Sequence, residues 1–164
     1  MFIEYLILIL SSITLLYIVY TDTEHTKTMN FIKTEPNAKL PTRATAGSAG
    51  HDFYLPKTVV INAHETVMVD SGIKVDIPKG YVLMLYPRSS LGIKNRIILA
   101  NTTGIIDSDY KDTIKLPLHN YDELPVILNK GDRVAQAVCV PYITTKTKPL
   151  SEERTGGIGS TGRN

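Results

Sequence analysis

Residues 99–116, LANTTGIIDSDYKDTIKL, determine how the rest of the chain is interpreted. They continue an apolar run that begins at Ile97, pass through an asparagine, a glycine and three aspartates, and end in alternating polar and apolar side chains from Thr113. Alternation with a period of two is typical of a half-buried strand. The stretch therefore predicts two strands joined by a turn that carries the Asn101 amide, the Asp107 carboxylate and the Tyr110 ring. Taken alone, an acidic hairpin tip without function would be the simpler interpretation.

Composition is that of an ordinary globular chain. The 164 residues suit one domain, and 43% hydrophobic with 21% charged residues can bury a core. A formal net charge of +2 is too small to indicate nucleic-acid binding, so an anionic ligand must be held by a few placed cations. The single cysteine, Cys139, excludes an intrachain disulfide and a cysteine-based zinc site, and its apolar surroundings predict a buried, inert thiol.

Short β-like runs separated by turn residues follow residue 39. Many short strands without a long helical period predict an all-β fold, a distorted jelly-roll barrel or sandwich. The strands are expected at residues 58–62, 66–70, 73–77, 81–86, 97–100, 113–118, 126–128 and 134–140.

The amino terminus is a different kind of sequence. Residues 2–20 are almost wholly apolar and approach the roughly 20 residues of a membrane-spanning helix. No lysine or arginine precedes them, which argues against a signal peptide, and the first basic residue, Lys27, follows them. The sequence predicts a membrane anchor with the remaining chain facing the cytoplasm. The alternative is a dispensable extension before a cytoplasmic domain that begins at Met29.

Three regions result from these patterns. Residues 1–28 form the amino-terminal extension, residues 29–150 the β domain, and residues 151–164 a glycine-rich arm. Such an arm is expected to be mobile unless a ligand orders it.

Two segments suit phosphate binding. Residues 87–92, PRSSLG, place Arg88 and two hydroxyls at the start of a short turn or helical segment, where a guanidinium can bind two phosphate oxygens. Residues 130–136, KGDRVAQ, offer the Gln136 amide. The structural alternatives are a helix cap for the first segment and an Asp132–Arg133 pair at a strand start for the second.

Two further segments are rich in glycine. Residues 46–55, AGSAGHDFYL, contain Asp52 at what reads as a tight turn entering a strand. Residues 154–162, RTGGIGSTG, have the composition of a phosphate-binding loop but lack the Gly-Lys-Ser/Thr order of a P-loop. An arginine and two hydroxyls in that tail favour anion binding over plain disorder.

Taken together, LPTRATAGSAGHD, PRSSLG, NTTGIIDSDY, KGDRVAQ and GGIGSTG resemble, in this order and spacing, the five motifs of the trimeric dUTP pyrophosphatases (dUTPases). The resemblance runs from about Leu40 to the end of the chain. It implies a jelly-roll fold, hydrolysis of dUTP to dUMP and pyrophosphate with Mg²⁺, and a homotrimer with its active sites between subunits. Dependence on a bound triphosphate and placed cations agrees with the chemistry of phosphoryl compounds.

The resemblance also assigns roles to individual residues. Asp107 matches the general base that activates the water attacking the α-phosphorus, and Tyr110 matches the residue that packs under deoxyribose and rejects UTP. Asp52 matches an aspartate that lies near the metal's water shell or serves as a structural partner. The positions that match base or sugar contacts are Asn101, Gly104, Ile106, Tyr110 and Ile158. The positions that match phosphate contacts are Arg88, Ser89, Ser90, Gln136, Arg154, Gly159, Ser160 and Thr161.

The chain departs from the family pattern in three places. Ile158 stands where an aromatic residue normally stacks on uracil, Arg154 is one residue closer to it than usual, and Asp112 replaces a glycine. Base stacking on an aromatic ring contributes about 1–3 kcal/mol in other proteins. We therefore expect weaker closure over the substrate and unchanged chemistry.

Other functions fit the sequence less well. A dCTP deaminase of the same fold would need a catalytic glutamate where Leu116, Pro117 and Leu118 stand. A non-catalytic dUTP sensor would have little reason to retain the polar set around Asp107. A jelly-roll structural or capsid-like module predicts none of these residues in register.

Overall fold

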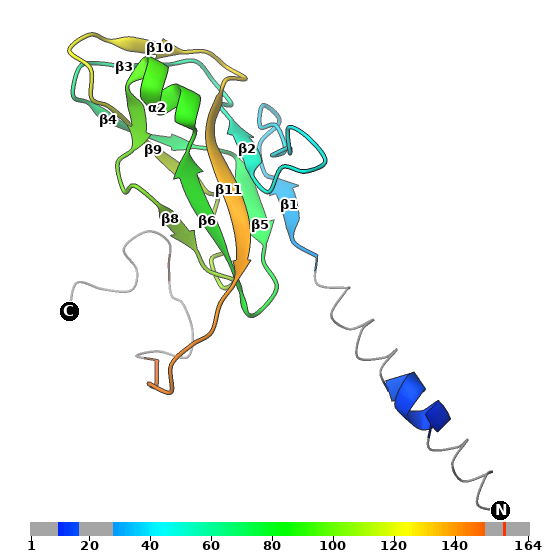
Figure 1. Ribbon diagram of the computed structural model, residues 1–164. Helices are drawn as coiled ribbons and strands as arrows, with labels where there is room; N and C mark the ends of the chain where they lie inside the picture. The colour runs from blue at the N-terminus through cyan, green and yellow to red at the C-terminus, as the bar shows by residue number, and fades with distance from the viewer. Residues whose placement is uncertain (1–9, 17–27, 150–155, 157–164) are drawn as a thin grey trace, which may run out of the picture.

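The computed structural model describes residues 10–16, 28–149 and 156 (Figure 1). Within these residues the chain forms a helical segment over residues 10–16, antiparallel strands, and a short helix after β6. Their bounds are β1 (Asn30–Lys33), β2 (His51–Tyr54), β3 (Val59–Ile61), β4 (Thr66–Asp70), β5 (Ile73–Asp76), β6 (Tyr81–Pro87), α2 (Ser89–Asn95), β7 (Ile97–Leu99), β8 (Gly104–Ile106), β9 (Lys115–Asn120), β10 (Val126–Leu128) and β11 (Arg133–Pro141).

Two larger sheets build the domain. One has the strand order β2-β11-β6-β8 and the other the order β4-β9-β7, while β1-β5 and β10-β3 form two-stranded ribbons beside them (Figure 1). Non-consecutive neighbours in both larger sheets show that the chain crosses repeatedly between them. The all-β jelly-roll fold predicted from the sequence is confirmed.

Alternating residues of the strands make the core. In β6, Leu83 and Leu85 are buried while their neighbours are half exposed, which is the period of two that a strand with one buried face must show. Leu116 and Leu118 of β9 are fully buried, as is Phe53 of β2. Side chains from both sheets therefore share one hydrophobic cluster.

The predicted strand positions agree with β3 to β7 and β9 to β11. β2 and α2 were expected only in general terms, as a strand entered from a tight turn and as a short turn or helical segment, and β1 and β8 were not predicted. β1 has three exposed residues of four, β2 follows directly on a glycine-rich segment, and β8 begins with a glycine, so none shows clear alternation. Helix α2 has seven residues, too few for a helical period to stand out.

The predicted hairpin is also more elaborate than expected. Its two strands do pair, with Leu99 of β7 opposite Leu118 of β9. The connection between them is not one turn, because residues 104–106 form β8, which pairs with β6 in the other sheet. The segment that carries the candidate catalytic residue therefore links the two sheets at one edge of the domain.

Of the predicted membrane anchor, the structure describes residues 10–16, which are helical. No helix in the described ranges is long and apolar enough to cross a membrane. The remaining residues of the predicted span lie outside the described residues, as do those of the glycine-rich arm apart from Gly156.

Candidate active site

Asp52 links two arginines that come from different parts of the chain. It lies in β2 with only 7% of its surface exposed. Its Oδ1 forms an ion pair with Nε of Arg88 at 2.9 Å, and its Oδ2 accepts a hydrogen bond from Nη1 of Arg133 at 3.0 Å. Arg88 also donates from Nη1 to the carbonyl oxygen of Arg133 at 3.3 Å. A nearly buried carboxylate between two guanidiniums fixes both, and it holds Arg88 in place just after β6.

Arg133 is a site residue that the sequence analysis did not identify, and the alternative pairing suggested for it is wrong. The neighbouring Asp132 accepts instead from the backbone N–H of Asn129 at 2.7 Å, which closes the turn before β11. Adjacent residues in a strand point to opposite faces, so a sequence neighbour is a poor partner for Arg133. The sequence feature that could have identified Arg133 is the presence of an arginine in this segment. Its partner, Asp52, is set by the pairing of β2 with β11, which the sequence pattern does not show.

Gln136 completes this group of residues. It lies in β11 between Asp52 of β2 and Tyr86 of β6, and its Nε2 donates to the carbonyl oxygen of Pro87 at 3.3 Å. A Cβ atom on Gly50 would come within 2.9 Å of Gln136 Oε1, so the glycine allows the amide to lie close to the backbone. Ser89 and Ser90 follow Arg88 as the exposed first residues of α2. We call Asp52, Arg88, Ser89, Ser90 and Gln136 the phosphate half-site.

A second group of predicted residues lies along β8 and the turns that flank it. Asn101 is exposed two residues after the end of β7, and its Nδ2 lies 3.6 Å from where a Cβ on Gly104 would be. The same Cβ would lie 3.2 Å from Leu85 Cβ, so β8 approaches β6 closely at this glycine. Ile106 is buried at the far end of β8.

Asp107 and Tyr110 share one turn at the end of β8. The backbone N–H of Tyr110 donates to the carbonyl oxygen of Asp107 at 3.1 Å, which closes four residues into a tight turn. Tyr110 is buried, with 7% of its surface exposed, and its hydroxyl donates to the carbonyl oxygen of Thr113 at 3.1 Å. The Asp107 side chain is half-buried. We call Asn101, Gly104, Ile106, Asp107 and Tyr110 the base half-site.

Within one chain, Asp107 of the base half-site does not meet Arg88 of the phosphate half-site. Ile106 lies opposite Leu83, near the start of β6, whereas Arg88 follows the other end of that strand (Figure 1). An extended strand rises about 3.3 Å per residue, so Asp107 and Arg88 are separated by roughly 20 Å. Two groups this far apart cannot act on the same phosphate.

A family model described as dUTPase matches residues 36–162. The chain belongs to the dUTPase family. Curated relatives agree along nearly their whole length. A deoxyuridine 5′-triphosphate nucleotidohydrolase of Hydrogenobaculum sp. (strain Y04AAS1) is 40% identical over 136 residues, covering 79% of this dUTPase and 94% of the relative. That of Candida albicans is 33% identical over 148 residues, covering 86% and 92% of the two chains.

Solved structures show the same fold. The crystal structure of dUTPase from Streptococcus mutans superposes with a TM-score of 0.66 at 32% identity, over 74% of this dUTPase and all of that chain. A mutant dUTPase of phage phi11 of S. aureus, described as coordinating a structural Mg(II) ion, gives a TM-score of 0.68 at 26% identity, over 76% and 97% of the two chains.

His51 precedes Asp52 in β2 and adds no positive charge beside the phosphate half-site at neutral pH. Burial and the nearby positive charge of Arg43 lower the pKa of His51, while a hydrogen bond with the backbone of Ala137 opposes them. The imidazole of this dUTPase is therefore neutral at pH 7. Cys139 is half-buried, not fully buried as the sequence predicted. Burial still raises the pKa of its thiol, which keeps the thiol protonated, as an inert role requires.

The described residues contain no group of three or more His, Cys, Asp or Glu side chains that could hold a metal ion. Both oxygens of Asp52, the residue matched to the metal's water shell, form ion pairs with arginines. In this dUTPase its observed contacts are those of a structural partner. The described donor set does not form a protein cage for Mg²⁺.

Proposed function

We propose that this dUTPase hydrolyses dUTP to dUMP and pyrophosphate with Asp107 as the general base. A carboxylate can orient a water molecule and accept its proton as the oxygen attacks the α-phosphorus, and the bond from that phosphorus to the bridging oxygen of the pyrophosphate then breaks. The observation that carries the proposal is the turn from Asp107 to Tyr110, because it holds a half-buried carboxylate next to a buried aromatic ring. Base, sugar and water can thereby be positioned by one short segment.

The phosphate half-site supplies positive charge for the triphosphate. Arg88 is held by Asp52 through Nε, so its guanidinium is oriented before substrate arrives. Pre-oriented donors stabilise the charge of phosphates without reorganising during the reaction. Ser89, Ser90 and Gln136 add neutral donors beside it. Because the described residues form no metal cage, we infer that Mg²⁺ arrives bound to the triphosphate, as part of the substrate.

The base half-site selects uracil and deoxyribose. The Asn101 amide, together with the backbone around Gly104 and Ile106, can pair with the edge of uracil, whereas cytosine would leave buried groups unpaired. The Tyr110 ring packs under the sugar, where a 2′-hydroxyl would collide with it. Contacts from Arg154, Ile158, Gly159, Ser160 and Thr161 over the bound nucleotide remain a proposal, since these residues lie outside the described ones.

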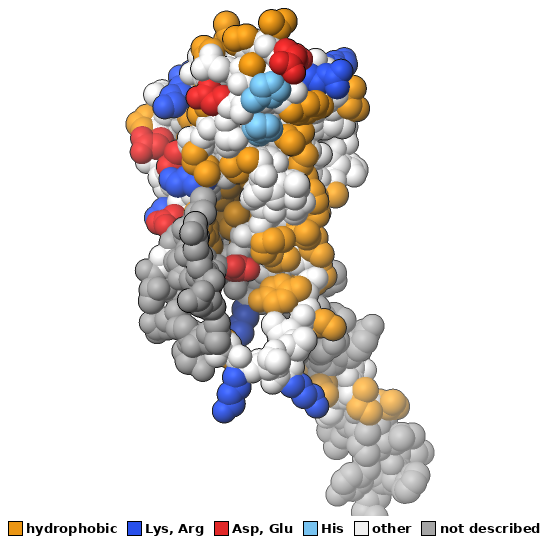
Figure 2. Space-filling model, turned by 90° about the vertical axis from the view of Figure 1, so that its left-hand side faces the viewer, with side chains coloured by type: hydrophobic (Ala, Val, Ile, Leu, Met, Phe, Trp, Pro, Cys, Tyr) orange, Lys and Arg blue, Asp and Glu red, His pale blue; other side chains and the backbone are white. Residues whose placement is uncertain are grey.

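A homotrimer would unite the two half-sites from different subunits. The separation of Arg88 from Asp107 within one chain supports this arrangement. The outer face of the four-stranded sheet supports it too, because Val138, Met84 and Ile105 align across β11, β6 and β8. Ile105 is 56% exposed, and hydrophobic side chains gather in a band along the domain (Figure 2). A contiguous apolar surface of this kind marks a contact between proteins.

Pyrophosphate release from dUTP tests the proposal, compared with release from UTP, dTTP and dCTP, each with Mg²⁺ and with a chelator. Asp107→Asn should lower kcat for dUTP by about 100-fold or more, the scale of general-base catalysis, and leave nucleotide binding nearly unchanged. Asp109→Asn, in the same turn, is the matched control and should retain turnover. Retained hydrolysis in Asp107→Asn would refute the assignment of the base.

A further inference from the structure

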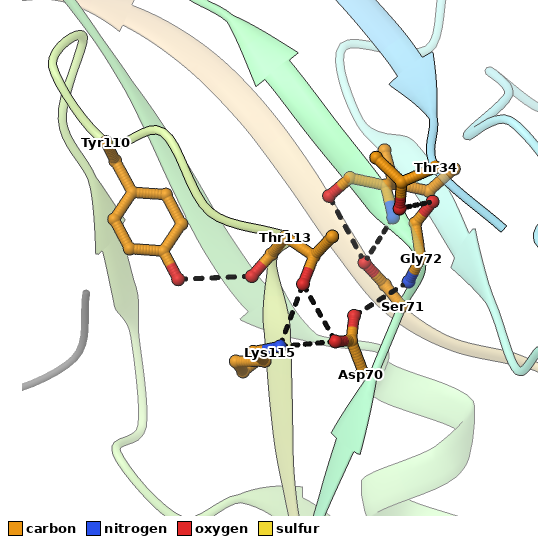
Figure 3. Close-up of polar contacts among 8 residues, drawn as sticks. Thr34, Asp70, Ser71, Gly72, Tyr110, Thr113 and Lys115 are labelled. Carbon is orange, nitrogen blue, oxygen red and sulfur yellow. Dashed lines mark hydrogen bonds and ion pairs between the residues drawn. The ribbon is translucent and has the colours of Figure 1, made fainter. Parts of the chain in front are cut away.

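Asp70, at the end of β4, is the centre of a polar cluster outside both half-sites (Figure 3). Its Oδ2 accepts from the Thr113 hydroxyl at 2.8 Å and pairs with the Lys115 ammonium. Lys115 also donates to Thr113 Oγ1 at 2.8 Å. The three side chains thus form a closed triangle of hydrogen bonds, and Asp70 and Lys115 are directly opposite in the β4–β9 pair.

The triangle rests on a turn with little freedom to move. Asp70 Oδ1 accepts from the backbone N–H of Gly72 at 2.9 Å, and the Gly72 carbonyl accepts from both N–H and hydroxyl of Thr34 at 2.9 and 3.0 Å. Ser71 is buried, with its Oγ accepting from the backbone N–H of Ile73. Hydrogen bonds to Thr34 therefore join the β4–β5 turn to the end of β1, and the turn fixes the position of the Asp70 carboxylate.

Thr113 connects the β4–β5 turn to the base half-site. Its hydroxyl is held by Asp70 and Lys115, and its backbone carbonyl accepts from the Tyr110 hydroxyl at 3.1 Å (Figure 3). The next residue, Ile114, is fixed by backbone hydrogen bonds with Ile73 and Ser71 at 2.8 and 3.1 Å. The Thr113 carbonyl, which accepts from the Tyr110 hydroxyl, is consequently held both by the side chain of its own residue and by the backbone of Ile114.

We propose that Asp70 and Thr113 are positioning residues that set how strictly Tyr110 rejects a ribonucleotide. The proposal rests on the proposed role of Tyr110 as the surface under the sugar. Discrimination against a 2′-hydroxyl requires that the ring cannot retreat by even a fraction of an ångström, because the hydroxyl needs only that space. A ring anchored only at its Cα end could tilt, whereas the hydroxyl bond to a fixed carbonyl holds its far end as well.

The test is the selectivity ratio, kcat/KM for dUTP divided by kcat/KM for UTP. Thr113→Val keeps the shape of the side chain but removes its hydroxyl, and Asp70→Asn removes the charge that holds it. Each should lower the ratio about three- to tenfold, the range that the net contribution of one hydrogen bond corresponds to. The fall should come mainly from improved use of UTP, with kcat for dUTP within about twofold of wild type. Thr113→Ser, which restores the hydroxyl, should restore the ratio.

Thr66→Val is the matched control. Thr66 is at the other end of β4, and its hydroxyl bonds to Nδ1 of His119 at 2.9 Å across the same strand pair. It should lower stability as much as Thr113→Val does, without changing selectivity. An unchanged ratio in Thr113→Val and Asp70→Asn would overturn the proposal, as would an equal fall in the control.

Failure of the proposed dUTP hydrolysis can be distinguished from failure of the positioning role of Asp70 and Thr113. If wild-type protein released no pyrophosphate from dUTP, catalysis as proposed would fail. Calorimetric binding of non-hydrolysable imido analogues of dUTP and UTP would still give a ratio of dissociation constants. That ratio should fall in Thr113→Val and stay at the wild-type value in Thr66→Val, and equal values in both variants would overturn the positioning role alone.

Discussion

At the residue scale, the Asp70 carboxylate links stability to pH. Burial pushes its pKa upward, but hydrogen bonds from the Lys115 ammonium, the Gly72 N–H and the Thr113 hydroxyl, with the charge of Lys115, outweigh that effect and lower the pKa below its ordinary value. The folded state therefore binds this proton less readily than the unfolded chain. The stabilisation is present in full above the ordinary pKa of an aspartate and is lost as the pH falls through the lower folded value.

We accordingly expect the effect of Asp70→Asn to depend on pH. At pH 7 the variant should melt about 2–4 °C below wild type, the scale of a partly exposed ion pair. The difference should shrink as the pH falls below about 4, the ordinary pKa of an aspartate, and disappear below the lower pKa of the folded wild-type carboxylate. Thermal melts of both proteins between neutral pH and pH 2.5 measure it, with Asp76→Asn on β5 as the control. A difference independent of pH would show that the charge of Asp70 is not what stabilises the turn.

Site residues were predictable from the sequence where one motif contains all the residues that act together. Asp107 and Tyr110 stand in one segment whose residue types specify the turn, and the structure places them together. Asp52 and Arg88 were identified separately, but their pairing, and the part of Arg133 in it, follows from the β2–β11 register, which residue patterns do not encode. The role of Thr113 was invisible, because it acts through its backbone carbonyl.

At the scale of elements, the β4–β5 turn depends on a glycine in two ways. Gly72 has a φ of +65°, and a Cβ there would come within 2.9 Å of Ala38 Cβ and 3.0 Å of Glu35 Cβ. Gly80 precedes β6 with a φ of +88°, and a Cβ there would meet nothing within 4 Å. The two glycines share the backbone requirement, but only Gly72 adds a steric one.

Gly72→Ala should therefore be the more damaging change. We expect Gly80→Ala to lower the free energy of unfolding by about 1 kcal/mol, since alanine tolerates positive φ poorly. Gly72→Ala should lower it by about 2–4 kcal/mol, because overpacking adds to that strain. Urea unfolding of the two variants beside wild type provides the comparison. Equal losses would mean that the residues around Ala38 yield without cost.

Elements were predicted best where a strand has one buried and one exposed face. β4 and β6 show that alternation over five residues, and β11 shows it over residues 135–138. β8 has only three residues, starts with a glycine and belongs to the sheet opposite its sequence neighbours, so a local pattern indicated a turn in its place. That strand matters for function, because it carries the base half-site away from the end of β6 where the phosphate half-site lies.

At the scale of the whole molecule, the two half-sites make a prediction about assembly. In a symmetric trimer, the base half-site of one subunit can face the phosphate half-site of the next, and each site then draws its groups from different chains. The apolar outer face of the β2-β11-β6-β8 sheet offers the surface on which such subunits would pack. The composition of each site, and not only the mass of the particle, can test this arrangement.

Mixing two inactive variants should restore activity. Arg88→Ala removes a phosphate contact and Asp107→Asn removes the general base, so each homotrimer should be nearly inactive. When the two chains are co-expressed in equal amounts, about one site in four should combine an intact Arg88 with an intact Asp107, giving about a quarter of wild-type activity. As a control, wild type mixed equally with the Arg88→Ala/Asp107→Asn double variant should retain about a quarter of its activity, against about half if each site lay within one chain. No recovery in the first mixture and half activity in the second would mean that Arg88 and Asp107 serve the same site from a single subunit, despite the length of β6 between them.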